Sequence, residues 1–508
     1  MMPTAGQWRA ARRTVTASGA VVLELPEGVA AHDLFAALAG APRRLFLDSA
    51  LVDATADGHS AAPRLGRHSF LAVDPIHVLE VAAAAGEDAG REVESLLATL
   101  RSILADLRCP TIPGLPPFQG GFAGLLAYEA GLALEGVAPA RAAAAGVPLV
   151  SLGLYDVVCA FDHDLGRGWL VSQGVPARGP AARARRAHER IDAWLAHLGC
   201  GRAAGTPPPA ALPPSARFPL AGHPGVFSTH SPAAYREMVA AGIEFVRAGD
   251  VFQVNLAQRL AVAGETDPTL LHLRARAVNP APFAASYDAG TVRITSMSPE
   301  RLLSVSRGTA RMHPIKGTRR VLALPEADLF AGDDLEASAK DRAENVMIVD
   351  LVRNDLARVC TAESVRVEAL CRLERYATVQ HLVSIVTGRL APERTALDAL
   401  VAAIPGGSVT GAPKRRACEI ISGLEPVARG AYCGSIGWLG LDGDADWNLL
   451  IRTLVAGGGA TTFAAGGGIT ASSDPAAEHA ESLHKAEGML RVLASLGGAG
   501  DAGREDRR

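Results

Sequence analysis

The stretch TTFAAGGGITASSDPAAEHAESLHKAEGMLRVLASL, residues 461–496, joins a strand signal to a helix signal across three glycines. Thr461 to Ala464 has the β-branched and aromatic composition of a strand. Asp474-Pro475 is an N-cap followed by proline at the first helical position, which predicts a helix that runs to about Ser495. This strand and this helix place the chain in the mixed α/β (α+β) class.

The predicted closing helix carries a charged face. Glu478, Glu481 and Lys485 are spaced so that they lie on one side of it. A separate apolar stripe is expected to be buried, formed by Leu483, Ala486, Leu490 and Leu493. Two carboxylates one turn apart can bind a hard cation, and the lysine can contact an anionic substrate. An ordinary solvated Glu–Lys pair is the alternative that the spacing leaves open.

Further helices and strands are predicted on both sides of a proline-rich segment. Helices are predicted over 183–198, 231–248 and 339–357, and strands over 45–47, 150–155, 169–172, 293–295, 302–305 and 434–439. Residues 201–225 carry seven prolines and are predicted to be a semi-extended linker. The linker separates an N-terminal region, 20–200, from a C-terminal region, 226–496, and residues 497–508 are expected to be a disordered tail.

Composition excludes several classes of protein. The 508 residues are 48% apolar, and 50 basic against 53 acidic side chains give a net charge of −3. This balance gives no electrostatic reason to bind nucleic acid or an acidic membrane surface. No apolar run reaches the length of a membrane span, and residues 1–15 lack the apolar region of a signal peptide. The seven cysteines never form a C-x-x-C pair. We therefore expect a cytoplasmic protein without a zinc site or a disulfide framework.

Lysine usage is the most informative count. Only four of the 50 basic residues are lysine: Lys316, Lys340, Lys414 and Lys485. Arginine can replace a lysine that carries surface charge, but not a lysine that must lose its proton to react. Some of these four lysines are therefore expected to have chemical roles, and the others to be chance survivors.

Further candidate residues lie in the C-terminal region. Lys316 adjoins Gly317 in a predicted turn, and Glu300 stands at a predicted strand entrance. Glu344 lies on the helix over 339–357, where either a metal ligand or a structural ion-pair lattice fits the pattern. The glycine segments 405–414 and 465–469 can bring backbone N–H groups against an anion, although tight turns explain most such runs.

Taken together, these motifs resemble the chorismate-utilising enzymes, the family of anthranilate synthase component I and aminodeoxychorismate synthase component I. In the C-terminal region the resemblance rests on SPER (298–301), PIKGT (314–318), KDRAEN (340–345), IVDLVRND (348–355), PGGSVTGAPK (405–414), IRT (451–453) and AGGGI (465–469). In the N-terminal region it rests on Leu47-Asp48-Ser49, GRHSFLAVDP (66–75) and FQGGFAG (118–124).

The resemblance implies a fold and a site. The fold is that of anthranilate synthase component I: two packed, largely antiparallel sheets flanked by helices, with the active site in a cleft of the C-terminal region. Mg²⁺ would be held by Glu344 and Glu481, with help from Glu478. The chorismate dianion would be bound by Gly317, Thr318, Tyr432, Arg452, the amides of Gly466, Gly467 and Gly468, and Lys485. His381 matches a histidine that lines the cleft and is a third candidate catalytic residue, with a structural histidine as the alternative.

Two positions favour aminodeoxychorismate synthase within the family. Gln253 stands where isochorismate and salicylate synthases have a lysine base, and Lys316 stands where anthranilate synthases have alanine. In the implied mechanism the Lys316 amine attacks C2 of chorismate, Glu300 protonates the departing C4 hydroxyl, and ammonia then enters at C4 and releases the lysine. No glutaminase elbow is present in the sequence, so a separate glutamine amidotransferase subunit is expected to supply ammonia.

Two alternatives remain open at this level. One is anthranilate synthase component I, and the other is a non-catalytic family member that only binds or regulates. The family's tryptophan pocket uses an LLES run and an NPSPY run, from which Phe46 to Ser49 and Asn279 to Phe283 depart. These departures leave tryptophan binding open.

Overall fold

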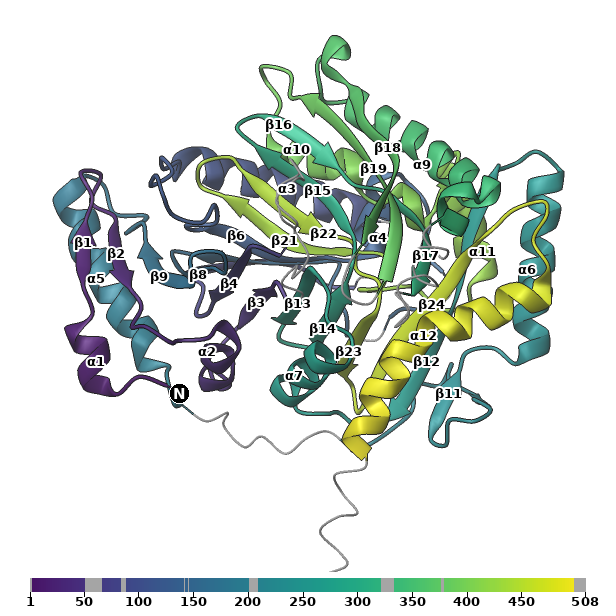
Figure 1. Ribbon diagram of the computed structural model, residues 1–508, viewed down its shortest axis with the longest axis horizontal. Helices are drawn as coiled ribbons and strands as arrows, with labels where there is room; N and C mark the ends of the chain where they lie inside the picture. Colours follow the sequence, from purple (N-terminus) through teal and green to yellow (C-terminus); the bar gives the residue numbers. More distant parts are fainter. Residues whose placement is uncertain are drawn as a thin grey trace, which may run out of the picture.

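The computed structural model describes residues 2–50, 66–83, 88–140, 142–144, 146–200, 209–320, 333–375 and 379–497. Its strands form two sheets, and the strand pairs among the described residues are antiparallel. One isolated parallel bridge joins Ala142 and Val427. The helices cover the outer faces of these sheets (Figure 1). This is the two-sheet α+β architecture that the sequence predicts.

The larger sheet contains strands from both sides of the proline-rich segment. In spatial order it consists of β1 (Arg13–Val15), β2 (Val21–Glu24), β9 (Arg167–Ser172), β8 (Val157–Asp162), β4 (His68–Ala72), β3 (Leu45–Asp48), β13 (Phe283–Asp288), β14 (Arg293–Ser298), β23 (Thr453–Gly457), β24 (Ala460–Ile469), β12 (Gln253–Ala263), β11 (Val226–Ser228) and β10 (Phe218–Pro219), with β20 (Gly411–Ala412) beside β12. The pairing of β3 with β13 joins the two regions of the sequence in one continuous sheet.

The smaller sheet also mixes the two regions, because β6 pairs with β21. Its order is β17 (Ile315–Arg320), β19 (Val379–Arg389), β16 (Thr309–Met312), β15 (Arg301–Ser306), β22 (Ala445–Asn448), β21 (Ser435–Gly440), β6 (Gly121–Leu126), β7 (Val150–Tyr155) and β5 (His77–Val81), with β18 (Arg366–Arg375) beside β19. The segment 201–225 therefore marks a boundary in sequence but not between separately folded bodies. Within it, residues 201–208 lie outside the described part, and Phe218–Pro219 forms β10.

The helices begin, in several cases, after a residue whose side chain caps the first turn. They are α1 (Ala5–Ala10), α2 (Ala31–Ala37), α3 (Ala89–Asp106), α4 (Tyr128–Leu134), α5 (Pro180–Ala196), α6 (Pro232–Arg247), α7 (Pro268–Val278), α9 (Ala339–Ala357), α10 (Ala396–Ala403), α11 (Lys414–Leu424) and α12 (Pro475–Gly497), with 3₁₀ turns η1 (Ala362–Ser364) and η2 (Gly407–Val409). Asp474 caps α12 by accepting from Ala476 N at 3.1 Å and Ala477 N at 2.8 Å. The predicted disordered tail lies almost entirely outside the described residues.

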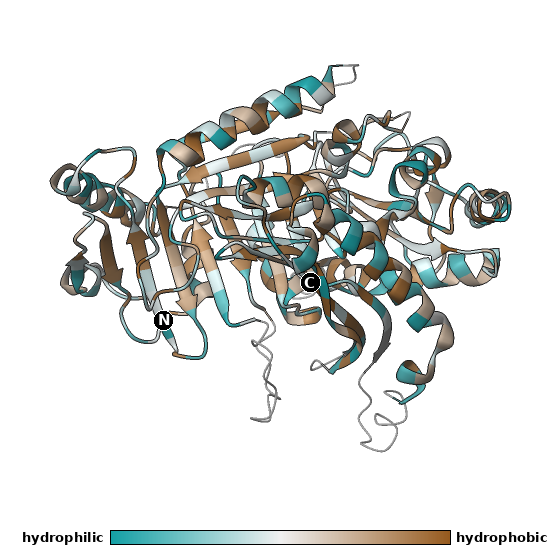
Figure 2. Ribbon diagram, turned by 90° about the horizontal axis from the view of Figure 1, so that it is seen from above, coloured by the Kyte–Doolittle hydropathy of each residue, from teal (hydrophilic) through white to brown (hydrophobic). Residues whose placement is uncertain are grey.

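The apolar cores explain the layering. One core lies between the two sheets and includes Phe70, Phe118, Tyr287 and Trp438. The rings of Phe118 and Trp438 are stacked there, with 5.0 Å between their centroids. Helices α7 and α12 bury their apolar sides on the other face of the larger sheet. Figure 2 shows the same pattern, with hydrophobic strands inside and hydrophilic residues on the outer helices. No helix among the described residues is long and apolar enough to cross a membrane.

Candidate active site

Lys316 lies in β17 and is partly buried. Its Nζ donates a hydrogen bond to the carbonyl oxygen of Ser408 in η2 at 3.3 Å. Burial lowers the pKa of Lys316, and the nearby Lys485 lowers it further, whereas the carboxylates of Glu344 and Glu300 oppose the shift. A lowered pKa makes the neutral amine, which is the form that can act as a nucleophile, easier to reach.

Glu300 lies at the corner between β14 and β15 and is only 7% exposed. The Ser408 hydroxyl donates a hydrogen bond to Glu300 Oε1 at 2.8 Å. Burial raises the pKa of Glu300 to about 7, against the opposing effects of the Ser408 hydrogen bond and of Lys316. A carboxyl group with this pKa can hold a proton at neutral pH and release it during a reaction. Ser408 thus touches both candidate catalytic groups.

A β-bulge in β17 places Gly317 beside His381. The register shifts between Lys316 and Thr318, and Gly317 there adopts φ of +71°, a conformation that favours glycine. His381 is fully buried in β19 and hydrogen-bonds with the backbone of Gly317. Burial and the nearby Arg452 lower the pKa of His381 to about 4, so its imidazole is neutral at physiological pH.

The glycines 466–468 lie in strand β24, which rules out a tight turn as the explanation for this run. Their backbone pairs with β12 through Gly466–Ala257, Gly467–Leu256 and Gly468–Asn255. A Cβ placed on Gly468 would lie 1.6 Å from Gln253 Nε2, and one on Gly466 would lie 2.1 Å from Leu256 O. The glycines are therefore required by close approach of the neighbouring strand and side chains.

The charged face of α12 covers this strand. A Cβ on Gly467 would lie 3.0 Å from Glu478 Oε2, 3.6 Å from Lys485 Nζ and 3.8 Å from Glu481 Oε1. Lys485 Nζ is 2.7 Å from Glu481 Oε1 and donates to Gly466 O at 3.1 Å. Glu478 is 4% exposed, whereas Glu481 and Lys485 are about half exposed. This face is thus a contact with the sheet rather than a fully solvated ion pair.

The buried stripe of α12 differs in detail from the predicted one. Ala486 and Leu490 are buried as expected, together with Met489 and Val492. Leu483 and Leu493 are only partly buried.

The three predicted metal ligands come from two helices. The carboxylates of Glu344 on α9 and Glu481 on α12 both raise the pKa of Lys316, because both lie near its amine. Among the described residues, no group of three or more His, Cys, Asp or Glu side chains is gathered closely enough to hold a metal ion. The donors nevertheless fit Mg²⁺ in type, because all are carboxylates and Gly467 leaves the space between Glu478 and Glu481 open.

Arg452 places a positive charge near His381 in the candidate site. It follows β22 with φ of +52°, and burial lowers the pKa of its guanidinium. Within the described part of the chain the guanidinium has no recorded hydrogen bond or ion pair. A partly buried cation of this kind is suited to bind an anionic group of a substrate.

Tyr432 is held by Arg429, a residue that the sequence analysis missed. The Arg429 guanidinium lies 5.6 Å from the Tyr432 ring centroid. It also donates to Val409 O at 2.8 Å and to Asn255 O at 2.8 Å, and it pairs with Glu425 at 2.6 Å. Arg429 therefore connects Tyr432 to β12 and to the loop that carries Ser408.

Three of the four lysine side chains are described by the structure. Lys316 and Lys485 lie at the candidate site, whereas Lys414 forms a structural ion pair with the buried Asp355 at 2.8 Å. The side chains of Lys340 and Thr318 lie outside the described part. The sequence did not single out Ser408, because the segment 405–414 was considered only for its glycines. A hydroxyl side chain within such a run could have indicated it.

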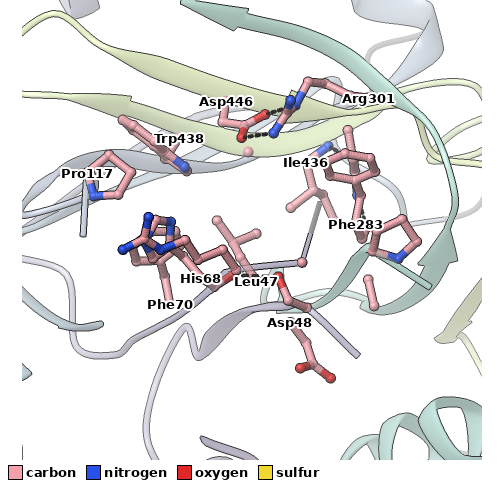
Figure 3. Close-up of a pocket in the computed structure, with 17 residues that line it drawn as sticks. Leu47, Asp48, His68, Phe70, Pro117, Phe283, Arg301, Ile436, Trp438 and Asp446 are labelled. Atoms are coloured by element: carbon pink, nitrogen blue, oxygen red, sulfur yellow. Dashed lines mark hydrogen bonds and ion pairs between the residues drawn. The ribbon is translucent and has the colours of Figure 1, made fainter. Parts of the chain in front are cut away.

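A cavity of about 120 Å³ lies elsewhere, between the two sheets (Figure 3). Arg301 pairs there with Asp446 at 2.9 Å and stacks over Phe283, 4.8 Å from its ring centroid. Asp48 is turned away from the cavity and accepts from Arg276 at 2.9 Å. The segments 47–49 and 282–284 both line this cavity, so the two runs that depart from the family's tryptophan pocket come together in space.

Comparison with known proteins points to one family. The sequence pattern described as "chorismate binding enzyme" matches residues 57–491. The chain is 42% identical to anthranilate synthase component 1 of Streptomyces coelicolor over 78% of this chain and 77% of the relative. It is 40% identical to aminodeoxychorismate synthase component 1 of Klebsiella aerogenes, over 75% of this chain and 78% of the relative.

Two further relatives agree. The chain is 37% identical to aminodeoxychorismate synthase of Streptomyces pristinaespiralis over 90% of its length, and the match spans 63% of that longer relative. The crystal structure of anthranilate synthase component I from Streptococcus pneumoniae superposes with a TM-score of 0.68 at 27% identity, covering 86% of this chain and 95% of the other.

Proposed function

This chain belongs to the chorismate binding enzyme family and is a chorismate-utilising enzyme, and from that premise we propose that it is aminodeoxychorismate synthase component I. The proposed reaction converts chorismate and ammonia to 4-amino-4-deoxychorismate, the precursor of 4-aminobenzoate in folate synthesis. One observation carries the choice. Lys316, with a lowered pKa, and Glu300, with a raised pKa, contact the same residue, Ser408. An amine whose pKa is lowered, beside an acid whose pKa is raised, suits nucleophilic displacement of a hydroxyl group.

The proposed chemistry balances with these two groups. The lone pair of the Lys316 amine forms a bond to C2 of chorismate, and the ring double bonds shift toward C4. The C4–O bond breaks, its electron pair leaves with oxygen, and the Glu300 proton converts the leaving group to water. The alkylated lysine nitrogen is then a secondary ammonium group. Ammonia attacks C4 and becomes an ammonium group there, the double bonds shift back, and the C2–N bond breaks so that Lys316 leaves as the neutral amine.

The substrate's two carboxylates need positive charge and hydrogen-bond donors. Arg452 and Lys485 supply charge, and the backbone of Gly317, Thr318 and the glycines 466–468 supplies donors. Tyr432 is proposed to contact the same substrate. Mg²⁺, held by Glu344, Glu478 and Glu481, would supply charge that holds a substrate carboxylate. His381, which is neutral, would line the site as a hydrogen-bonding group rather than as a cation.

Ammonia is proposed to come from a separate glutamine amidotransferase. Relatives carry the name component 1, which implies a second component in those proteins. None of the seven cysteines lies in a glutaminase-type elbow. The purified chain is therefore expected to use ammonium salts but not glutamine. Glutamine-dependent turnover by this chain alone would contradict the proposal that a separate subunit supplies ammonia.

Anthranilate synthase component I is the second candidate, favoured by the 42% identical relative from Streptomyces coelicolor. The two candidates differ in product, because anthranilate forms with loss of pyruvate. Mass spectrometry of the product from chorismate, Mg²⁺ and ammonium chloride separates them. Accumulation of 4-amino-4-deoxychorismate supports the proposal, and formation of anthranilate overturns it.

Substitution of Lys316 tests the mechanism. Lys316→Ala should retain chorismate binding but lose several powers of ten in turnover. Lys316→Arg should fail equally, since a guanidinium stays protonated and cannot attack. Lys414→Arg, which keeps a positive charge opposite Asp355, is the matched control and should remain active. Without ammonia, the wild-type protein should gain mass on the peptide that contains Lys316. Substantial activity of Lys316→Arg without such an adduct would refute the nucleophile assignment.

A further inference from the structure

Ser408 is the residue through which the two proposed catalytic groups are connected. Its carbonyl oxygen accepts from Lys316 Nζ at 3.3 Å, and its hydroxyl donates to Glu300 Oε1 at 2.8 Å. These are backbone and side-chain atoms of one residue, so the positions of amine and acid depend on the same turn.

That turn is held from several sides. Thr410 Oγ1 donates to Gly406 O at 3.0 Å and thereby closes the turn on itself. The Arg429 guanidinium donates to Val409 O at 2.8 Å, and Asn255 N of β12 donates to Thr410 O at 2.7 Å. Ser408 therefore projects from a segment with little freedom to move, which is what a residue that orients two reacting groups requires.

We propose that Ser408 is a positioning residue for the reaction: its hydroxyl fixes the orientation of the Glu300 carboxyl group, while its carbonyl directs the Lys316 amine. This inference rests on the proposed function and deepens it. When the hydroxyl donates to Oε1, that oxygen serves as the acceptor, and the acidic proton is left on Oε2. The carbonyl takes one N–H of Lys316, which leaves the nitrogen lone pair directed elsewhere, toward the substrate.

The hydroxyl also affects the proton affinity of Glu300. A donated hydrogen bond stabilises the carboxylate form and lowers the pKa against the effect of burial. Two other groups on neighbouring elements act on Glu300: the charged Lys316 on β17, and the backbone of Ile315 through a hydrogen bond. Removing the Ser408 hydroxyl leaves both of these unchanged, so its effect on Glu300 can be isolated.

Ser408→Ala tests the role of the hydroxyl separately from that of the carbonyl, since it deletes the hydroxyl and keeps the carbonyl that contacts Lys316. Glu300 must be protonated to act, so turnover falls as pH rises through its pKa. In Ser408→Ala this alkaline limb should move upward by about one pH unit, the size expected for one hydrogen bond to a charged group. Turnover on the acidic side should fall roughly tenfold, because the acid is no longer oriented. Ser408→Thr, which restores a hydroxyl, should recover the wild-type profile.

Thr410→Ala is the matched control for loosening of the turn. It removes a hydroxyl that bonds Gly406 in the same segment and does not touch Glu300. Its rate is expected to drop without any movement of the alkaline limb. Infrared difference spectra between each variant and the same variant with Glu300→Gln report protonation of this carboxyl directly, whether or not it limits the rate.

The outcomes separate this inference from the proposed function. If wild type makes 4-amino-4-deoxychorismate and Ser408→Ala shows the same Glu300 titration as wild type, the role of Ser408 is refuted while the function stands. If wild type makes another product, the proposed function fails, and the infrared titration alone then decides whether Ser408 controls the protonation of Glu300. A titration shifted upward in Ser408→Ala but not in Thr410→Ala supports the inference.

Discussion

Because Glu300 is buried, we predict that the free energy of unfolding falls as pH rises. The pKa of its carboxyl group rises from 4.5 to about 7 on folding, because burial disfavours the charged form. A folded-state pKa above the unfolded value means that the stabilising effect is complete below pH 4.5 and is lost as pH rises through about 7. At roughly 1.4 kcal/mol for each pKa unit, the loss amounts to about 3 kcal/mol at pH 8. Glu300→Gln replaces the titrating group with a neutral amide of similar shape and removes this dependence.

The assay is urea denaturation of wild type and Glu300→Gln at several pH values between 4.5 and 8. Tryptophan fluorescence and far-ultraviolet circular dichroism should give coincident transitions before free energies are compared. The free energy of unfolding of the variant, minus that of wild type, should increase by about 3 kcal/mol from pH 4.5 to pH 8. Glu244→Gln on α6 is the control, since that carboxyl is 70% exposed, and it should show no such increase. A flat difference for Glu300→Gln would refute the burial argument.

Two further outcomes are expected. EDTA should abolish turnover, and Glu481→Ala should do the same without loss of the folded state by circular dichroism; full activity in metal-free buffer would contradict the metal assignment. Gly466→Ala should destabilise the protein by roughly 1–3 kcal/mol, because the new Cβ meets Leu256 O of the paired strand. Gly423→Ala on α11 meets nothing within 4 Å and should stabilise by roughly 0.5–1 kcal/mol, so equal urea midpoints for these two variants would refute the packing argument.

Helix positions were predictable because their signals are local. The prediction of 339–357 for α9 matches the observed bounds, and Ser231-Pro232 and Asp474-Pro475 mark the starts of α6 and α12. An N-cap hydrogen bond joins atoms within about three residues, so no distant part of the chain is needed to form it.

Long strands were harder to predict. β12, Gln253–Ala263, was noted only for its motif, because its sequence QVNLAQRLAVA shows no clear alternation of apolar and polar residues. Most of it is buried, and it is paired on one side with β24 and on the other with β11 and β20. A strand covered on both faces lacks the period-two pattern that identifies a half-exposed strand.

The sequence by itself determined the family, the fold class, the capped helices and the chemical identity of the candidate groups, including Lys316 and Glu300. Only the tertiary structure decided that these two meet at Ser408, which is 92 residues from Lys316 and 108 from Glu300 along the chain. It also decided that Gly466 to Gly468 lie in a strand beneath α12. Contacts at such separations depend on sheet pairing and burial, and burial in turn sets the pKa values, because desolvation is a property of the packed surroundings and not of the residue type.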